Sequence, residues 1–475
     1  MKKIIYYLFW MLIWVMAYSQ NSVIVDEPSF HGPTIKTLIK EYHYPVTISC
    51  VSTDYGSATF ILSGSNMQTI ERTVEKLRVE DMSIVCLGKE ATLYDTLFFC
   101  GCDNTGLAAT IGFFNIHDFF FGSGNVQIHS AFGTSANGIY VENLYRLETY
   151  SASNGSRHVV CTGTTSSYLS CIVDLSDDMF GIWGYQSGYL ADHMEHITDI
   201  KYVTTNFDEY LVTAGFNDQF GKYLNIRIYE PDNIFSTSGP QDTRHVFCID
   251  TAFTCEWMWN DILLAKLNNN YFATVSYKNI CNQDFLQKDY EEELLNYLHL
   301  GIYDIPAILG GSLSGMVGSY LAEAQGVINN RLMQFIGRNG SDLAFLQQIR
   351  PYPSGYSYSV FCELKITNNT TLSGHSKYLA SNYLFQGMDL YNSSTRYVMG
   401  GYKSSNAYSL NYEMETFWAS KHCAEPDTYK WGKINPYRSI NSIYGFETIG
   451  GLSNFTTRGS TLYEVPLTII CSDDE

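Results

Sequence analysis

The sequence predicts an all-β fold, a β-propeller of four-stranded antiparallel blades. Three observations favour it: a hairpin-like segment recurs along the chain, 15% of the residues are aromatic, and only 16% are charged. Many short, largely buried strands need such apolar and aromatic side chains. The composition is not that of a disordered chain, and 37 Gly in 475 residues are too few for collagen.

The recurring segment is an apolar strand, a polar turn with Gly, Asn, Asp or Ser, and an alternating strand. Eight segments fit this pattern, at 50–64, 98–116, 159–175, 211–230, 272–305, 346–366, 397–415 and 448–467. The intervals between them leave room for two further strands, and a four-stranded unit of this size is typical of a propeller blade. We therefore expect eight blades, with seven as the alternative count and a β-sandwich as the alternative architecture.

The N-terminus has the features of a secretory signal peptide. Lys2 and Lys3 precede an apolar run at 4–17, and small residues allow cleavage after Ser19. The run is shorter than the roughly 20 residues that span a membrane, so an uncleaved anchor is the less favoured alternative. The segment resembles those of exported proteins from Bacteroidetes-type bacteria. We expect a periplasmic or extracellular protein with no stable membrane span after cleavage.

The predicted domain organisation is simple. Residues 1–19 are the signal peptide, and 20–475 form one propeller domain with an insertion around 283–330. Within that insertion, 283–298 has a helical pattern. Residues 22–27, SVIVDE, form a candidate strand that would complete the last blade, because an open sheet edge invites aggregation.

The 12 cysteines all follow the signal peptide, so they reach a compartment that permits disulfides. Cys161 and Cys171 bracket a predicted hairpin and could pair across it, and Cys248 and Cys255 form another near pair. Buried free thiols are the alternative, because Cys also behaves as a small apolar residue.

Some segments resemble kelch repeats. The double glycine at 400–401 follows an apolar strand and is followed by Trp418; 450–451 is a second double glycine, and 228–232 is similar to the end of a kelch strand. The resemblance implies a kelch-like propeller, a class made mostly of binding platforms, although some members are oxidases. Ser52–Phe60 resembles the Asp box of sialidase-type propellers with one extra residue, which implies a structural turn.

Large aromatic side chains near predicted strand ends are the candidate binding residues. They are Phe119, Phe120 and Phe121 in one segment, and Trp257 and Trp259 in another. Alternation on a strand can bury only one face, so at least one of the three Phe rings should face solvent or lie in a loop. Packing between blades is the alternative role for all five rings.

Chemistry-bearing motifs are scarce. The sequence has no GxSxG elbow, HExxH motif or Walker loop, and we assign no catalytic residue and expect no cofactor. His193, Glu195 and His196 are weak candidates for metal ligands, and a polar loop is the alternative.

These observations favour an exported, non-enzymatic propeller that binds an envelope protein or a glycan through its loops. The alternative is a propeller enzyme that acts on carbohydrate, a glycosidase or a lyase, because a fold alone does not determine function. The formal net charge of −19 argues against nucleic acid as a partner. Loss of the signal peptide removes two Lys and no acid, which leaves 27 basic and 48 acidic residues and a net charge of −21.

Overall fold

The computed structural model describes the helices and strands between Ile24 and Thr456. It also describes the connecting residues 76, 92–95, 108, 122–126, 132, 152, 155–156, 205–208, 230–231, 270 and 310. The predicted signal peptide at 1–19 lies outside the described residues.

The strands group into sheets that follow one another along the chain. The first four sheets are blade 1 with β2 (Phe30–Leu38), β3 (Val46–Thr53), β4 (Ser57–Gly64) and β5 (Met67–Glu75); blade 2 with β6 (Leu77–Val85), β7 (Thr96–Asp103), β8 (Ala109–Asn115) and β9 (Gln127–Ser130); blade 3 with β10 (Gly133–Thr134), β11 (Ile139–Ser151), β12 (Arg157–Thr165), β13 (Ser170–Asp177) and β14 (Trp183–Tyr189); and blade 4 with β15 (Glu195–Thr204), β16 (Glu209–Asn217), β17 (Leu224–Tyr229) and β20 (Arg244–Cys248).

Three further sheets complete the set. They are blade 5 with β21 (Glu256–Asn268), β22 (Tyr271–Cys281), β23 (Leu295–Asp304), β24 (Met316–Ala324) and β34 (Phe455–Thr456); blade 6 with β25 (Val327–Arg338), β26 (Asp342–Pro351), β27 (Tyr358–Thr367) and β28 (Thr371–Tyr378); and blade 7 with β29 (Tyr383–Tyr391), β30 (Arg396–Ser404), β31 (Asn411–Lys421), β32 (Tyr429–Lys433), β33 (Ile443–Tyr444) and β1 (Ile24–Asp26). A short ribbon of β18 (Phe235–Ser236) and β19 (Gly239–Pro240) lies beside blade 3.

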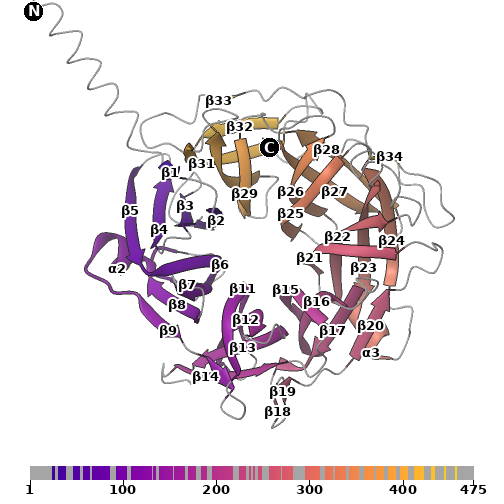
Figure 1. The fold of residues 1–475 in the computed structure, drawn as a ribbon, viewed down its shortest axis with the longest axis horizontal. Helices are drawn as coiled ribbons and strands as arrows, with labels where there is room; N and C mark the ends of the chain where they lie inside the picture. The colour runs from indigo at the N-terminus through magenta and orange to yellow at the C-terminus, as the bar shows by residue number, and fades with distance from the viewer. Residues whose placement is uncertain are drawn as a thin grey trace, which may run out of the picture.

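The blades form a closed ring (Figure 1). The inner strands β2, β6, β11, β15, β21, β25 and β29 contact one another in this order, and β29 contacts β2. The fold is therefore an all-β propeller, as predicted. The described residues contain seven sheets of four or more strands, which matches the alternative count rather than the favoured count of eight.

Seven of the eight predicted repeat segments are the second and third strands of a blade, from β3 and β4 in blade 1 to β30 and β31 in blade 7. In blades 2 and 3, where burial is described for both strands, most of their residues are buried, which explains the apolar sequences. The described part of the eighth segment is β34, and it pairs with β24 at the outer side of blade 5.

The ring is closed by an N-terminal strand, as the sequence predicted for 22–27. Strand β1 pairs antiparallel with β31, and Val25 lies opposite Tyr412. Strand β32 pairs with the other half of β31, from Phe417 to Lys421. Blade 7 therefore combines strands from both ends of the propeller, which leaves fewer unpaired edge groups on β31.

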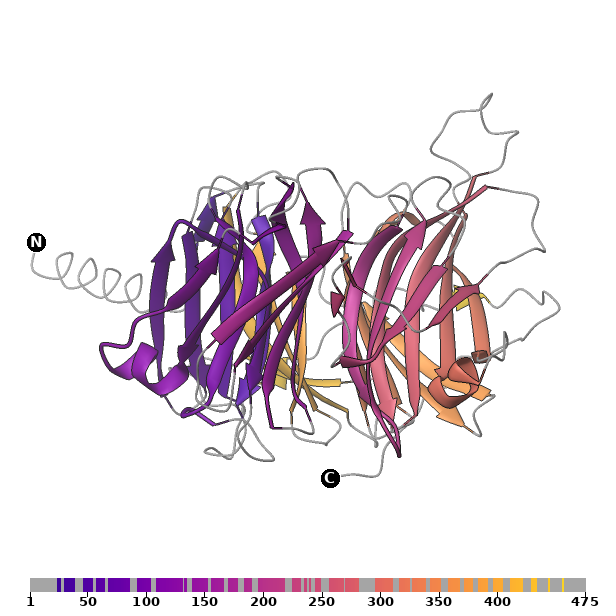
Figure 2. The ribbon, with the colours of Figure 1, turned by 90° about the horizontal axis from the view of Figure 1, so that it is seen from below.

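Two short helices lie on one side of the ring. Helix α2 (Ile116–Phe121) and helix α3 (Ile305–Leu309) each connect the third strand to the outer strand of a blade, in blades 2 and 5. Figure 2 shows both at the same rim. We call this side, which also carries the turns from inner to second strands, the helix face.

The segment predicted as an insertion, 283–330, has regular structure where it is described. It contains β23, α3, β24 and the start of β25, which belong to blades 5 and 6. The last four residues of the predicted helix at 283–298 lie in β23, so the helical prediction is wrong there. Pairing of β23 with both β22 and β24 stabilises the strand over the local helical pattern.

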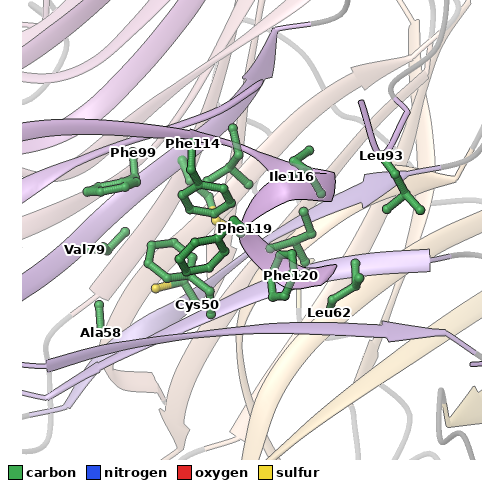
Figure 3. Packing of buried hydrophobic residues seen from close by; sticks show 14 of the residues in the cluster. Cys50, Ala58, Leu62, Val79, Leu93, Phe99, Phe114, Ile116, Phe119 and Phe120 are labelled. Carbon is green, nitrogen blue, oxygen red and sulfur yellow. The ribbon is translucent and has the colours of Figure 1, made fainter. Parts of the chain in front are cut away.

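Blades pack through apolar faces, with Phe rings prominent between blades 1 and 2. Phe60 of β4 is fully buried, with ring centroids 5.3 Å from Phe99 and 5.1 Å from Phe114. Figure 3 shows this cluster together with Phe119 and Phe120 from α2. Packing between blades is therefore one use that the fold makes of its aromatic residues.

Buried carboxylates also join neighbouring blades. Asp81 of β6 and Asp199 of β15 each lie at a β-bulge in an inner strand. An Oδ2 atom accepts a hydrogen bond from the next inner strand in each case, from Leu147 N at 3.0 Å and from Leu264 N at 2.7 Å. Each contact satisfies a backbone N–H that sheet pairing would otherwise leave unpaired at this position.

The cysteines of the described blades 1 to 3 are buried free thiols rather than disulfides. Cys161 and Cys171 do not face each other, because the register pairs Cys161 with Val173 and Cys171 with Gly163. Disulfide pairing between them is therefore not observed, and the free-thiol alternative holds. Cys255 of the other predicted pair lies outside the described residues.

Candidate functional site: an aromatic row on the helix face

Helix α2 is a single turn that begins where β8 ends. Its N-cap is Asn115, whose Oδ1 accepts a hydrogen bond from Asp118 N at 3.1 Å. The Asn115 Nδ2 donates to the carbonyl of Tyr94 at 2.8 Å, so the same side chain fixes the loop that precedes β7. Gly122 ends the helix with its N–H bonded to Asp118 O. The cap therefore sets both the helix and the neighbouring loop.

Further hydrogen bonds attach α2 to its surroundings. His117 N donates to Leu93 O at 2.6 Å, and Ile116 N donates to Asp95 O at 3.0 Å. At the other end, the Arg72 guanidinium of β5 donates through Nε to Phe119 O at 3.3 Å and through Nη2 to Phe120 O at 3.0 Å. Arginine is well suited to this role because its fork of donors reaches two acceptors at once. Arg72 of blade 1 therefore anchors a helix that belongs to blade 2.

Two of the three predicted Phe residues face inward. Phe119 and Phe120 are buried, and Phe119 stacks on Phe114 with ring centroids 4.0 Å apart (Figure 3). Their role is packing, because a helical turn directs both rings toward the blade 1 and blade 2 core. Phe119 and Phe120 therefore have the alternative role of packing between blades and are not placed for ligand contact.

The third ring, Phe121, faces solvent and joins two other exposed rings. Phe121 is 47% exposed and Tyr94 is 65% exposed, while the side chain of His117 is 41% exposed. Tyr94 stacks on His117 with centroids 5.1 Å apart, and His117 lies 5.5 Å from Phe121. We call Tyr94, His117 and Phe121 the aromatic row. Its exposure agrees with the expectation that at least one Phe ring faces solvent.

A carboxylate lies at the edge of the aromatic row. Asp118 is exposed, and its Oδ1 lies 3.5 Å from Nδ1 of His117. The row therefore offers apolar ring surface next to one acceptor group and one imidazole. Such a mixture of an exposed aromatic centre with polar groups at its margin suits recognition of another molecule.

The second pair of predicted binding residues lies elsewhere in the ring. Trp257 and Trp259 are on β21 of blade 5, where their backbones lie opposite Ile280 and Lys278. They are separated from the aromatic row by blades 3 and 4, so the structure does not bring the two predicted groups together. Contact of these Trp side chains with a partner stays a prediction.

The weak metal candidates are only partly described. Glu195 and His196 begin β15, with their backbones opposite Asn217 and Phe216, and His193 lies outside the described residues. Within the described part of the chain, no group of three or more His, Cys, Asp or Glu side chains could hold a metal ion. Metal binding at 193–196 is therefore still a prediction that rests on the sequence.

Two members of the aromatic row, Tyr94 and His117, were not predicted from the sequence. Tyr94 lies in a loop more than 20 residues before Phe121, and only the folding of α2 against that loop brings their rings together. His117 was part of the HDFFFG segment, and a helical turn at 116–121 would have placed it on the side of Phe121, four residues later. A helical interpretation of this segment, which begins with the N-cap residue Asn115, is the signal that could have identified the row.

Comparisons with known proteins give fold-level likeness only. No protein-family model matches the chain, and no curated protein matches it. Solved structures that resemble it include the WD40 domain of SCAP from fission yeast, at 9% identity and a TM-score of 0.41, covering 88% of this chain and 91% of that one. The GH93 α-L-arabinofuranosidase of Fusarium graminearum with arabinobiose has 10% identity and a TM-score of 0.38, covering 75% and 97%. An ACO/RPE65 chimera has 9% identity and a TM-score of 0.40, covering 91% and 94%.

These structures resemble the chain in fold and give no information about its activity. A membrane-spanning helix would need a long apolar stretch, and no helix in the described part of the chain has one.

Proposed function

We propose that the protein is an exported, kelch-like propeller that binds a protein partner through the aromatic row, without catalysis at the row itself. The observation that carries the proposal is the exposure of Tyr94, His117 and Phe121 side by side on a rigidly held helix and its neighbouring loop. Exposed aromatic residues that are already ordered lose little entropy on binding, and Tyr in particular is enriched at interfaces.

The anchoring of α2 supports this proposal. Single exposed apolar residues are common on protein surfaces and need no explanation. Here, however, five hydrogen bonds from Asn115, Arg72 and the backbone at 116–117 hold the three rings in one place. Inward-facing Phe119 and Phe120 fill the space beneath. This arrangement keeps apolar ring surface exposed to solvent. The exposure is unfavourable in the free protein, and burial against a partner would relieve it.

The geometry favours a protein over a glycan. The rings of Tyr94 and His117 stack nearly parallel, with 19° between their planes, so each ring covers one face of the other. The edges of the two rings and one outer ring face remain available for contact. The mixed side chains of a protein surface suit such a shape. Export is supported by the signal-peptide features of residues 1–19, and we place the partner in the envelope or outside the cell.

The test is site-specific photo-crosslinking in the producing cell. A benzoylphenylalanine at position 94 or 121 should yield the same crosslinked protein, because both residues belong to one row. The matched control is position 140, where Tyr140 is also 57% exposed but lies at the start of β11, on the opposite face. It should yield no such product.

The purified partner then gives the quantitative result. Tyr94→Ala and Phe121→Ala should each weaken binding by about tenfold or more, because central aromatic residues dominate interface energies. A glycan array with the mature protein decides between partner classes. Glycan binding that is lost in both variants would assign a glycan instead, and an empty array with no crosslink at 94 or 121 would refute a binding role for the row.

A further inference from the structure

Three polar side chains form a hydrogen-bonded chain at the helix-face end of blade 3. Ser156 precedes β12, His158 is the second residue of β12, and Asp174 lies on β13. Ser156 Oγ is 2.7 Å from Nε2 of His158, and the Nδ1 atom of His158 is 3.0 and 3.2 Å from the two carboxylate oxygens of Asp174. Register explains the contact, because His158 pairs with Ser176 and Asp174 is its diagonal neighbour on the same face.

The hydrogen bonds set the direction of the chain. An ionised carboxylate only accepts, so the proton of the imidazole is on Nδ1 and is donated to Asp174. Nε2 is then an acceptor, and the hydroxyl of Ser156 donates to it. This is the order in which a serine hydroxyl is activated by an imidazole that a carboxylate orients.

Packing holds the imidazole in this orientation. The Tyr150 ring lies parallel to His158 at 4.8 Å, with 4° between the planes, and Tyr202 of blade 4 stacks on Tyr150 at 4.3 Å. Asp174 is 7% exposed, whereas Ser156 is half-buried and follows the exposed Gly155. The imidazole and the carboxylate are therefore largely enclosed, and Ser156 is partly exposed.

Blades 2, 4 and 5 have no such group at these positions. Their residues equivalent to His158 and Asp174 are aromatic, aliphatic or glycine, namely Leu97 with Gly112, Tyr210 with Ile228, and Phe272 with Gly301. A buried charged pair is weak evidence for stability, since apolar residues often serve as well or better. The presence of the pair in blade 3 therefore points to a role other than packing.

We propose that Ser156, His158 and Asp174 form an esterase site, with Ser156 as nucleophile, His158 as general base and Asp174 as its positioning residue. The substrate class is a carboxylic ester, whose carbonyl carbon is the group that an activated serine hydroxyl attacks.

The reaction consumes one ester and one water. Ser156 Oγ forms a bond to the carbonyl carbon while its proton moves to Nε2 of His158. The tetrahedral intermediate reforms the C=O bond and breaks the bond to the alcohol oxygen, and the alcohol takes the proton from Nε2. Water then attacks the acyl-serine in the same way, which releases the carboxylic acid and returns the proton to Ser156. No oxidation or reduction occurs.

Active-site labelling of the mature protein tests this proposal. A fluorophosphonate probe should attach one label per chain, and peptide mass spectrometry should place it on Ser156. Ser156→Ala should abolish the label, and His158→Gln should slow labelling by about 100-fold or more. p-Nitrophenyl acetate should give a burst of p-nitrophenol equal to the protein concentration, which is the signature of an acyl-enzyme.

The controls separate catalysis from structure. Ser151 is exposed across the same turn, opposite Arg157, and Ser151→Ala should leave the labelling rate unchanged. Asp174→Asn should slow labelling even in samples whose thermal midpoint shows a folded chain. Folded wild-type protein with no label on Ser156, or a label no faster than that on Ser151, would overturn the proposal. Neither result depends on the aromatic row.

Discussion

Blades 2 and 3 carry different side chains at one pair of equivalent positions. Blade 2 has Leu97 as the second residue of β7 and Gly112 opposite Phe99, and this region is wholly apolar. Blade 3 has His158 and Asp174 at these positions, hydrogen-bonded to each other. The two blades share one backbone arrangement and use it for different side-chain chemistry.

The charged side chains in the interior of blade 3 are each paired, which limits the cost of burying them. In blade 3, the carboxylate of Asp174 accepts from His158, and the neighbouring Arg157 and Asp177 form an ion pair. In blade 2, the space that Asp174 occupies in blade 3 is filled by the ring of Phe99. Packing density therefore decides which of the two arrangements a blade can hold.

The largest effect is expected when a carboxylate like that of Asp174 in blade 3 is introduced at the equivalent position of blade 2, Gly112. A Cβ atom at Gly112 would overlap the Phe99 ring, so Gly112→Asp adds both a steric clash and an unpaired buried charge. We expect a loss of at least about 4 kcal/mol in the free energy of unfolding, measured by guanidinium denaturation.

Gly155→Asn is the matched control for this substitution. Gly155 has a φ of +88° and open space where a Cβ atom would stand, and Asn tolerates positive φ. Its loss should stay below about 1 kcal/mol. An equal loss in both variants would mean that crowding by Phe99 is not what separates blade 2 from blade 3.

The repeat itself was predictable from sequence, because the second and third strands of every blade need apolar residues on both faces. This pattern located the central hairpins of seven blades, and the need to pair an open sheet edge located the strand within 22–27. The eighth repeat segment looked the same locally. Residues 455–456 pair with β24, which lies far away in the sequence, and no local sequence pattern identifies this partner.

The site residues were harder to predict for the same reason. At least one of the three Phe rings was expected to be exposed, and Phe121 is. Phe119 and Phe120 turn inward because 116–121 is helical rather than extended. The Ser156, His158 and Asp174 contact crosses two strands. It depends on a register that places Asp174 diagonal to His158, and the sequence alone cannot fix register between two strands of similar length.

The next largest effect tests the reverse exchange, in which blade 3 receives apolar residues. Asp174→Ala leaves the buried Nδ1 of His158 without its acceptor, and we expect a loss of about 2 kcal/mol in unfolding free energy. The double variant His158→Phe with Asp174→Gly copies Phe272 and Gly301 of blade 5. It should be neutral or more stable than wild type, since replacing both partners removes the desolvation cost.

Denaturation midpoints of the single and double variants decide this point. A double variant that is less stable than Asp174→Ala would show that the pair is needed for folding, and blade 3 would then differ from blade 5 in packing as well as in chemistry. Labelling by the fluorophosphonate should be slower in Asp174→Ala, which lacks the positioning residue, and slower still in the double variant, which also lacks the general base.

The smallest effect concerns two lysines on inner strands, Lys201 on β15 of blade 4 and Lys266 on β21 of blade 5. Lys201 Nζ lies 3.3 Å from Glu148 and 3.7 Å from Asp199. Lys266 Nζ instead donates to Thr204 at 3.1 Å and lies 5.9 Å from the Tyr202 ring centroid. One lysine therefore has carboxylate partners and the other has neutral ones.

The pKa values of these lysines should move in opposite directions. Burial alone lowers the pKa of Lys201, but Asp199 and Glu148 raise it more, so the net pKa lies above its ordinary 10.5. Burial lowers the pKa of Lys266, and Glu148 only partly offsets this. A raised pKa stabilises the fold at pH values below 10.5, and the contribution is lost as the pH rises through the raised value. A lowered pKa has the opposite sign: the folded state is penalised at low pH, and the penalty disappears as the pH rises.

Lys201→Met and Lys266→Met measure this difference at pH 7 and pH 10. At pH 7, Lys201→Met should lower the unfolding free energy by about 1 kcal/mol, a modest value because the Lys201 side chain is 26% exposed. Lys266→Met should leave stability unchanged or raise it slightly, and any gain should shrink at pH 10, where wild-type Lys266 sheds its proton more readily in the folded state. If both variants lost the same stability at pH 7, the carboxylates beside Lys201 would not distinguish the two lysines. Other contacts would then hold these inner strands together, such as the hydrogen bond from Leu264 N of blade 5 to Asp199 of blade 4.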